Sequence, residues 1–206
     1  MISHKRVQDR LSKIVDTSFE IISEKIANGL IQIDNEASFQ LQFGMILKAL
    51  GEMLAVAIGD KFDVFMERNI EGVTTCKSKG CARCDIFLTL TSGVNTTNCA
   101  LELKYFPKKR GETTTDNRFA ILMDIENIEA YKSLKTPKKC DNGYVVVYTT
   151  NKNYKASRTR SSIKIGDGCS LGSGKIRYNK RTVNISGNYT FDWTDFKNHY
   201  FLKLEI

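Results

Sequence analysis

The chain has 206 residues, of which 41% are hydrophobic and 26% are charged, and its formal net charge is +8. This balance is typical of a globular protein with a sizeable core, and it excludes disordered, fibrous and collagen-like chains. No run approaches the ~18 apolar residues of a membrane span and the start of the chain lacks a signal-peptide core, so we expect a cytoplasmic protein with no membrane partner and with reduced cysteines.

The spacing of apolar residues predicts two helices at the start of the chain. Residues 5–27 repeat apolar side chains at helical intervals, and Gly29 follows as a stop signal. A second helical pattern over residues 39–54 follows Asp34 and Asn35, either of which can cap a helix. Gly59 lies near its expected end. Each helix is expected to pack its apolar face against a sheet.

Two apolar runs on either side of a polar turn predict a β-hairpin over residues 83–106. The register depends on the turn, which begins at Thr91. A turn of six residues places Asp85 opposite Glu102, and a turn of eight places Asp85 opposite Lys104. In both registers the three side chains share one face of the hairpin, because side chains alternate along a strand.

Two carboxylates and one ammonium therefore converge on this hairpin. Neighbouring carboxylates repel unless a positive charge lies between them, and oxygen ligands of this kind suit Mg²⁺ or Mn²⁺. A metal site is the simplest account, and a surface salt-bridge cluster is the alternative. The Asp…Glu-x-Lys pattern of Asp85, Glu102 and Lys104 resembles the PD-(D/E)xK nuclease superfamily. The proline of that motif is absent here, because Cys84 precedes Asp85.

The resemblance implies a restriction-endonuclease-like α/β fold, in which a mixed central β-sheet is flanked by helices and completed by closing C-terminal strands. It also implies that Asp85, Glu102 and the Leu103 carbonyl hold Mg²⁺ or Mn²⁺, and that Lys104 positions or helps to deprotonate the attacking water. A glutamate on the helix before the sheet often completes the metal site in this family, and Glu36 has that place in the order of elements. The alternative is that Glu36 only complements the helix dipole.

The rest of the chain follows the same order of elements. Residues 62–70 predict a first strand that ends at Glu71-Gly72, residues 116–131 predict a helix, and residues 144–149 predict a strand buried on both faces. We expect one domain over residues 1–206, with helices in 1–58, a catalytic core in 60–150, and a basic segment with closing strands in 151–206. The closing strands are expected at 183–185, 189–193 and 200–206.

Three cysteines raise the alternative of a structural zinc site. Cys76, Cys81 and Cys84 have short spacings that suit thiolate ligands. Against zinc, no histidine lies nearby, and Cys84 falls inside the predicted strand, where a small apolar thiol packs well.

Basic residues are concentrated after the predicted core. Residues 151–182 contain nine lysines and arginines against one acid. Such a segment is the expected footprint of contacts with a phosphate backbone, and a solvated surface loop is the alternative. The residues expected to bind nucleic acid are Lys108, Lys109, Arg110, Lys152, Lys155, Arg158, Arg160, Lys164, Lys175 and Arg177.

The sequence thus predicts a metal-dependent nuclease that hydrolyses phosphodiester bonds of nucleic acid, DNA rather than RNA, as in a restriction or defence endonuclease. Cleavage of both strands would need a homodimer. The alternative is a non-catalytic nucleic-acid-binding module on the same fold, and a third interpretation is an interaction domain with an incidental basic loop.

Overall fold

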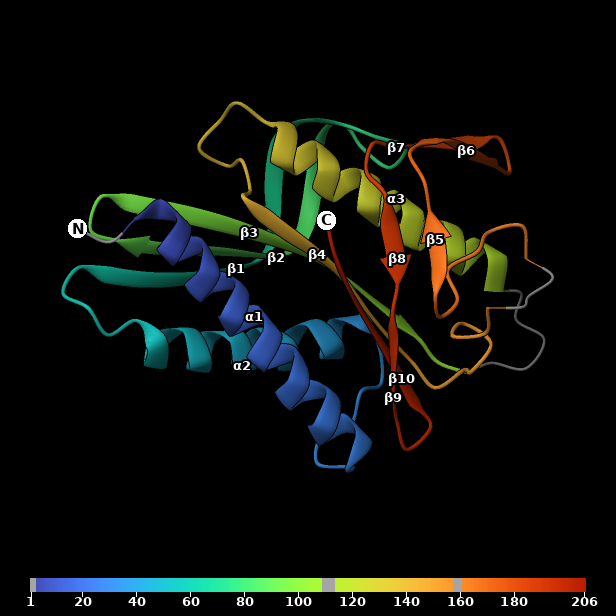
Figure 1. The fold of residues 1–206 in the computed structure, drawn as a ribbon, viewed down its shortest axis with the longest axis horizontal. Coiled ribbons are helices and arrows are strands. Elements are labelled where there is room, and N and C mark those ends of the chain that lie inside the picture. The colour runs from blue at the N-terminus through green and yellow to red at the C-terminus, as the bar shows by residue number, and fades with distance from the viewer. Residues whose placement is uncertain (1–2, 109–113, 158–160) are drawn as a thin grey trace.

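In the computed structural model, which describes residues 3–108, 114–157 and 161–206, a six-stranded mixed sheet has helices on both faces (Figure 1). The helices are α1 (His4–Ala27), α2 (Glu36–Leu54) and α3 (Thr114–Ser133). The strands are β1 (Asp60–Thr74), β2 (Lys79–Ser92), β3 (Asn95–Phe106), β4 (Asn142–Thr149), β5 (Cys169–Leu171), β6 (Gly174–Tyr178), β7 (Arg181–Ile185), β8 (Tyr189–Phe191), β9 (Trp193–Phe196) and β10 (His199–Glu205). The α/β class expected from the sequence is confirmed.

The six strands follow the order β1-β2-β3-β4-β10-β9. Strands β3 and β4 are parallel, and the other neighbours are antiparallel. A parallel pair needs a crossover connection, and α3 provides it. Because β3 carries Glu102 and Lys104, the crossover brings α3 across the face of the sheet on which these side chains lie.

The end of α1 and the start of α2 coincide with local signals that the sequence carries. Asn35 rather than Asp34 caps α2, since its side chain accepts a 2.8 Å hydrogen bond from the backbone N–H of Ser38. Gly29 follows α1 at a positive φ of 71°, which glycine adopts without strain. Helix α2 ends at Leu54, before Gly59. None of the described helices combines the length and the apolar character that a membrane crossing requires.

The two faces of the sheet have separate cores. One face packs Leu101 and Leu103 of β3 against α1 and α2, and the other packs Ala100 and Phe106 against α3. This confirms the alternation expected for β3. The first strand is longer than predicted, because Glu71 and Gly72 form a bulge and β1 continues to Thr74.

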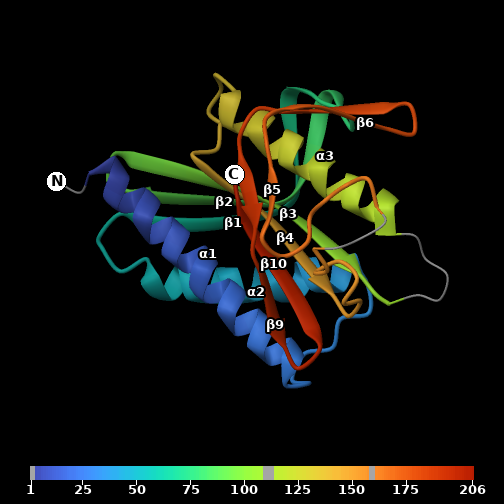
Figure 2. The same cartoon turned by 45° about the vertical axis from the view of Figure 1, so that its right-hand side comes forward.

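The segment after β4 covers the outer side of α3. Its strands form the two-stranded sheets β5–β8 and β6–β7, and the β6–β7 hairpin projects beyond α3 (Figure 1, Figure 2). The buried guanidinium of Arg118 on α3 holds this segment by donating hydrogen bonds to the carbonyls of Asn153, Tyr154 and Ile163. The described part of this segment is therefore anchored by buried residues such as Tyr154, Ile163 and Ile165, while most of its basic side chains are exposed.

The closing strands lie where the sequence predicts them, except that the predicted strand over residues 189–193 is divided between β8 and β9. Residues 183–185 and 189–191 are connected by a turn, but β7 pairs with β6 and β8 pairs with β5. Strand β10 joins the main sheet between β4 and the edge strand β9, as the apolar run at the end of the chain suggests. Strands β5 and β6 are short and rich in polar residues, so their pairing depends on packing against α3.

Candidate functional site

The candidate site lies where β2 and β3 stop pairing. The hairpin pairs Thr91 with Thr96, which selects the six-residue turn, and the ladder ends at the pair Ile86–Leu101. Asp85 follows on β2 at this end, and its Oδ2 accepts a 2.7 Å hydrogen bond from the Leu103 N–H. The Asp85 side chain thereby serves as the hydrogen-bond acceptor for a backbone N–H of β3. This bond fixes the position of the carboxylate.

The Lys104 ammonium is surrounded by oxygen atoms from four elements, α2, β2, β3 and α3. Its Nζ donates to the Leu103 carbonyl at 2.6 Å and to Glu36 Oε1 at 3.2 Å. It also lies 3.5 Å from Asp124 Oδ2 and 4.0 Å from Asp85 Oδ2. The structure thus brings three predicted residues, Glu36, Asp85 and Lys104, to one place.

Glu102 is turned toward α3 and is 2% exposed. Its Oε1 accepts a 2.8 Å hydrogen bond from the Tyr131 hydroxyl and a 3.5 Å bond from the Asn127 amide. The charges of Asp85 and Asp124 act on Glu102, so it belongs to the same electrostatic group. Two residues one turn apart on α3 therefore hold this carboxylate from outside the hairpin.

Asp124 and Lys77 are members of the group that the sequence motif does not include. Asp124 is fully buried on α3, and its Oδ1 accepts a short hydrogen bond from Lys77, in the loop between β1 and β2. Its Oδ2 makes no hydrogen bond within the described residues. The sequence carries no signal that sets Asp124 apart, because α3 also contains the acidic residues Glu126 and Glu129.

The cluster of Glu36, Asp85, Glu102, Asp124, Lys77 and Lys104, here called the acid–lysine cluster, holds four carboxylates and two ammonium groups. Burial raises the pKa of Asp85 to about 6, and the neighbouring carboxylates add to this shift. Burial also raises the pKa of Glu102 to about 8, with further contributions from Asp124 and Asp85. Burial alone would lower the pKa of Lys104, but the carboxylates outweigh it and raise that pKa. Lys104 is therefore charged at neutral pH, and burial shifts Glu102 toward its protonated form.

The positions of the side chains limit which of them can share a metal ion. Within residues 3–108, 114–157 and 161–206, no three histidine, cysteine, aspartate or glutamate side chains stand around one point where they could bind a metal ion. This covers Cys76, Cys81 and Cys84, which are partly buried, exposed and buried. Cys84 packs in the core beside α3, as a small apolar thiol does. The three cysteines therefore form no zinc site.

The predicted nucleic-acid contacts divide into three groups. Lys175 and Arg177 are exposed on one side of β6, and Lys108, Lys152 and Lys164 are also exposed. Lys155 is partly buried and forms a 3.6 Å ion pair with Asp195. The remaining predicted contacts, Lys109, Arg110, Arg158 and Arg160, lie outside the described residues.

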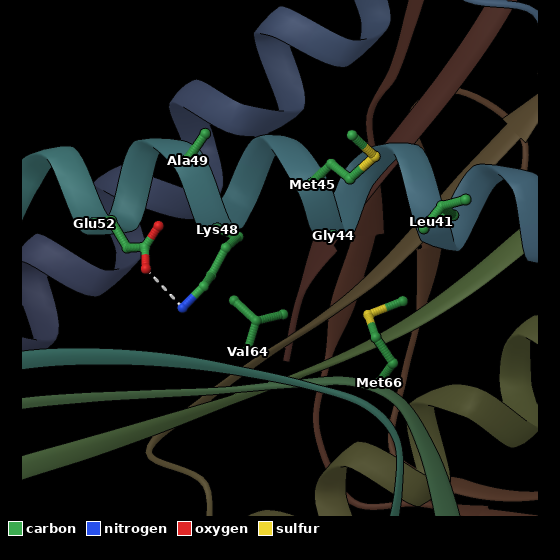
Figure 3. A pocket seen from close by; sticks show the side chains of 8 residues that line it. All are labelled: Leu41, Gly44, Met45, Lys48, Ala49, Glu52, Val64 and Met66. Carbon is green, nitrogen blue, oxygen red and sulfur yellow. Dashed lines mark ion pairs between the residues drawn. The ribbon is translucent and has the colours of Figure 1, made fainter.

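A shallow apolar groove of about 460 Å³ lies between α2 and β1 (Figure 3). Met45 and Met66 line it and are 59% and 40% exposed. Lys48 and Glu52 form a 2.8 Å ion pair at its wall. None of its eight lining residues belongs to the acid–lysine cluster, so the groove is a separate surface feature.

Comparison of the chain with protein-family models, with curated proteins and with solved structures finds no match.

Proposed function

We propose that the protein is a metal-dependent nuclease that hydrolyses phosphodiester bonds of DNA on a restriction-endonuclease-like fold. The observation that carries the proposal is the position of the Lys104 ammonium among the carboxylates of Glu36, Asp85 and Asp124. Buried acids beside a lysine are groups that phosphoryl transfer uses to hold a cation, a phosphate oxygen and the attacking water. The succession of hairpin, crossover helix and parallel strand supports the fold.

The donor atoms fit Mg²⁺ or Mn²⁺, because they are hard oxygens and the carboxylates of the cluster outnumber its ammonium groups. Mg²⁺ at such sites often takes one or two carboxylates, while water and substrate phosphates complete the shell. Asp85, Glu102 and the Leu103 carbonyl would hold the ion, with Glu36 beside them, and binding of the ion would have to displace the proton that burial favours on Glu102. When bound, the ion would lower the pKa of a coordinated water and offset charge on the scissile phosphate.

Lys104 would act as a hydrogen-bond donor in this reaction. Its raised pKa keeps the ammonium charged at neutral pH, so it is a poor acceptor for a proton from water. A charged ammonium can donate to the attacking water or to a phosphate oxygen, and its attraction grows as negative charge develops on that oxygen. Of the two roles expected for Lys104, positioning the water is therefore the one that its environment favours.

Nucleic acid is the proposed substrate because exposed cations lie on a projecting element. Lys175 and Arg177 lie on the outward side of the β6–β7 hairpin, and their partners across the ladder are Asn184 and Thr182. Cations without a cross-strand acid can pair with backbone phosphates and release counterions. These contacts do not read sequence, so they support a substrate class and no particular site.

A non-catalytic nucleic-acid-binding module is the second candidate. It is favoured by one observation, that Lys104 fills the space between the carboxylates and no set of three metal-binding side chains converges within the described residues. In that case the acid–lysine cluster would be a buried ion-pair network that stabilises the point where β2 and β3 stop pairing.

Incubation of the purified protein with supercoiled plasmid, linear DNA and RNA, each with Mg²⁺, Mn²⁺ or EDTA, tests the proposal. We expect nicking or linearisation of DNA with either metal and none in EDTA. Binding of DNA without cleavage under any metal would select the non-catalytic module. Cleavage that persists in EDTA would exclude the metal-dependent mechanism.

A further inference from the structure

The two carboxylate oxygens of Asp124 have different surroundings, which a simple structural ion pair does not require. One carboxylate oxygen, Oδ1, accepts from Lys77, while Oδ2 is buried and makes no hydrogen bond among the described residues. A buried carboxylate oxygen without a donor is costly. Its Oδ2 instead faces Lys104 Nζ at 3.5 Å, which is an ion-pair distance and longer than a good hydrogen bond. This oxygen therefore retains capacity for a closer cation.

The Lys104 ammonium stands where four oxygens from four different residues approach one cation. The oxygens belong to the Leu103 carbonyl, Glu36, Asp124 and Asp85, at 2.6, 3.2, 3.5 and 4.0 Å from Nζ. Only the carbonyl is at the distance of a short bond. An ammonium offers three donors, so it cannot bond to all four oxygens at once. A small divalent cation can contact more oxygens and carries twice the charge.

We propose that the Lys104 ammonium marks the position of a divalent-cation site, and that Asp124, together with Asp85 and the Leu103 carbonyl, is a ligand of that cation. This inference rests on the proposed metal-dependent function and extends it by a ligand outside the hairpin motif. The cation and the ammonium compete for the same oxygens, so binding of one moves Lys104 away from them. The displaced ammonium stays near the site, since its backbone adjoins Leu103.

The purely structural account makes a different prediction. If Asp124 only ties α3 to the loop that carries Lys77, its charge affects folding and has no effect on cation binding beyond that of any nearby acid. If Lys104 is a fixed part of a metal site, its removal weakens or leaves unchanged the affinity for metal. Competition predicts instead that removal of Lys104 increases the affinity for metal, because it removes both a rival cation and a like charge.

Calorimetric titration of the metal-free protein with Mn²⁺ separates these accounts without using activity as the readout. The two test variants are Asp124→Asn and Lys104→Met. Asp116→Asn is the matched control on the same helix, since the Asp116 side chain is 55% exposed. Lys79→Met is the matched control for the lysine, because Lys79 is exposed at the start of β2.

We expect Asp124→Asn to weaken Mn²⁺ binding at least about tenfold, the lower end of what loss of an outer-shell partner costs. We expect Lys104→Met to tighten it by about tenfold, since a unit positive charge next to the ion is removed. Thermal unfolding in EDTA shows whether each variant is folded. If Asp124→Asn does not fold, Lys104→Met decides alone.

Equal Mn²⁺ affinity in Asp124→Asn and Asp116→Asn, or weaker binding in Lys104→Met, overturns the inference. If the wild type cleaves DNA with Mn²⁺ under those results, the proposed function stands and only the ligand assignment fails. If the wild type shows no Mn²⁺ binding and no cleavage, both fail together.

Discussion

The acid–lysine cluster and the basic β6–β7 hairpin hold their charges in opposite ways. In the cluster, four carboxylates and two ammonium groups come from α2, β2, β3, α3 and the loop between β1 and β2, and each contact joins a particular pair of atoms. Asp85, Glu102, Asp124 and Lys104 are its more buried members. On the hairpin, Lys175 and Arg177 are exposed and far less constrained. Water screens surface charges, whereas buried charges act strongly on one another. The cluster should therefore respond to single substitutions, and the hairpin to total charge and salt.

The cleavage rate should distinguish the acid–lysine cluster from the β6–β7 hairpin more strongly than any other measurement. Replacing Asp85 with Asn, or Lys104 with Ala, should lower the cleavage rate by at least about 10²-fold, the usual cost of removing one preorganised electrostatic contact to the reacting group. DNA affinity should change little. Single-turnover cleavage at saturating DNA is the measurement, and Asp116→Asn is the matched control. Comparable rates in the wild type and both variants would remove these residues from the mechanism.

Replacing both Lys175 and Arg177 with Ala provides the reverse test of the same comparison. The double variant should bind DNA more weakly but cleave bound DNA at the wild-type rate, because surface cations position the duplex without touching the reaction. A reduced cleavage rate at saturating DNA would show that the hairpin takes part in the cleavage step as well as in binding.

Stability should depend on pH through Glu102. Its pKa is about 8 in the folded protein against an ordinary value of 4.5, so the folded state keeps a proton that the unfolded chain releases between these values. In EDTA the free energy of unfolding should therefore fall as pH rises from 6 to 8, by up to about 1.4 kcal/mol per pH unit. Asp85, with a pKa of about 6, adds a decrease in the same direction below that range.

Urea unfolding at pH 6 and pH 8 measures this slope, and Glu102→Gln should flatten it because glutamine does not ionise. The matched control is Glu20→Gln on the exposed side of α1, which should keep the wild-type slope. A slope that survives in Glu102→Gln would assign the pH dependence to another group.

The salt dependence of DNA affinity should reveal whether the basic β6–β7 hairpin contacts phosphates. If Lys175 and Arg177 each pair with one phosphate, replacing both with Ala should reduce the slope of log affinity against log salt by up to about 2. Lys155→Ala should change the slope less, because Lys155 pairs with Asp195 in the free protein. Equal slopes in the wild type and the double variant would move the binding surface elsewhere. The corresponding test on Arg158 and Arg160 concerns residues outside the described ranges.

Glu36 should show the smallest effect, because its side chain is 41% exposed and meets Lys104 through one 3.2 Å contact. We expect Glu36→Gln to change the free energy of unfolding by about 0–1 kcal/mol, as for other solvent-exposed ion pairs. It should also reduce cleavage less than Asp85→Asn does. A loss of cleavage equal to that of Asp85→Asn would give Glu36 a direct role in holding the cation.

Local patterns in the sequence were sufficient to predict most of the main sheet and the meeting of three charged residues. Alternation along β3 fixes that Glu102 and Lys104 share a face, and the polar turn after β2 limits the register to two choices. The capped start of α2 places Glu36 at a helix end. These features depend on residues close in the chain, where geometry leaves few alternatives.

The partners from α3 could not be predicted in this way. Asp124 lies 20 residues beyond Lys104 in the chain, and the crossover between β3 and β4 sets which side of the helix faces the sheet. The sequence predicts a helix over residues 116–131, and in the structure α3 is buried on nearly every side because β5 to β8 cover it. A helix buried all round shows no single apolar stripe, so its polar residues can face either the site or the cover.

The sequence by itself determined strands β1 to β4 and β10, the capped start of α2 and the shared face of Asp85, Glu102 and Lys104, because each follows from side-chain alternation and turn chemistry over a few residues. Tertiary structure decided which oxygens surround the Lys104 ammonium, and it turned Glu102 toward Tyr131. It also paired β7 with β6 rather than β8. These outcomes depend on packing between segments that are distant in the chain. Burial at that contact strengthens the electrostatic interactions between the charged side chains.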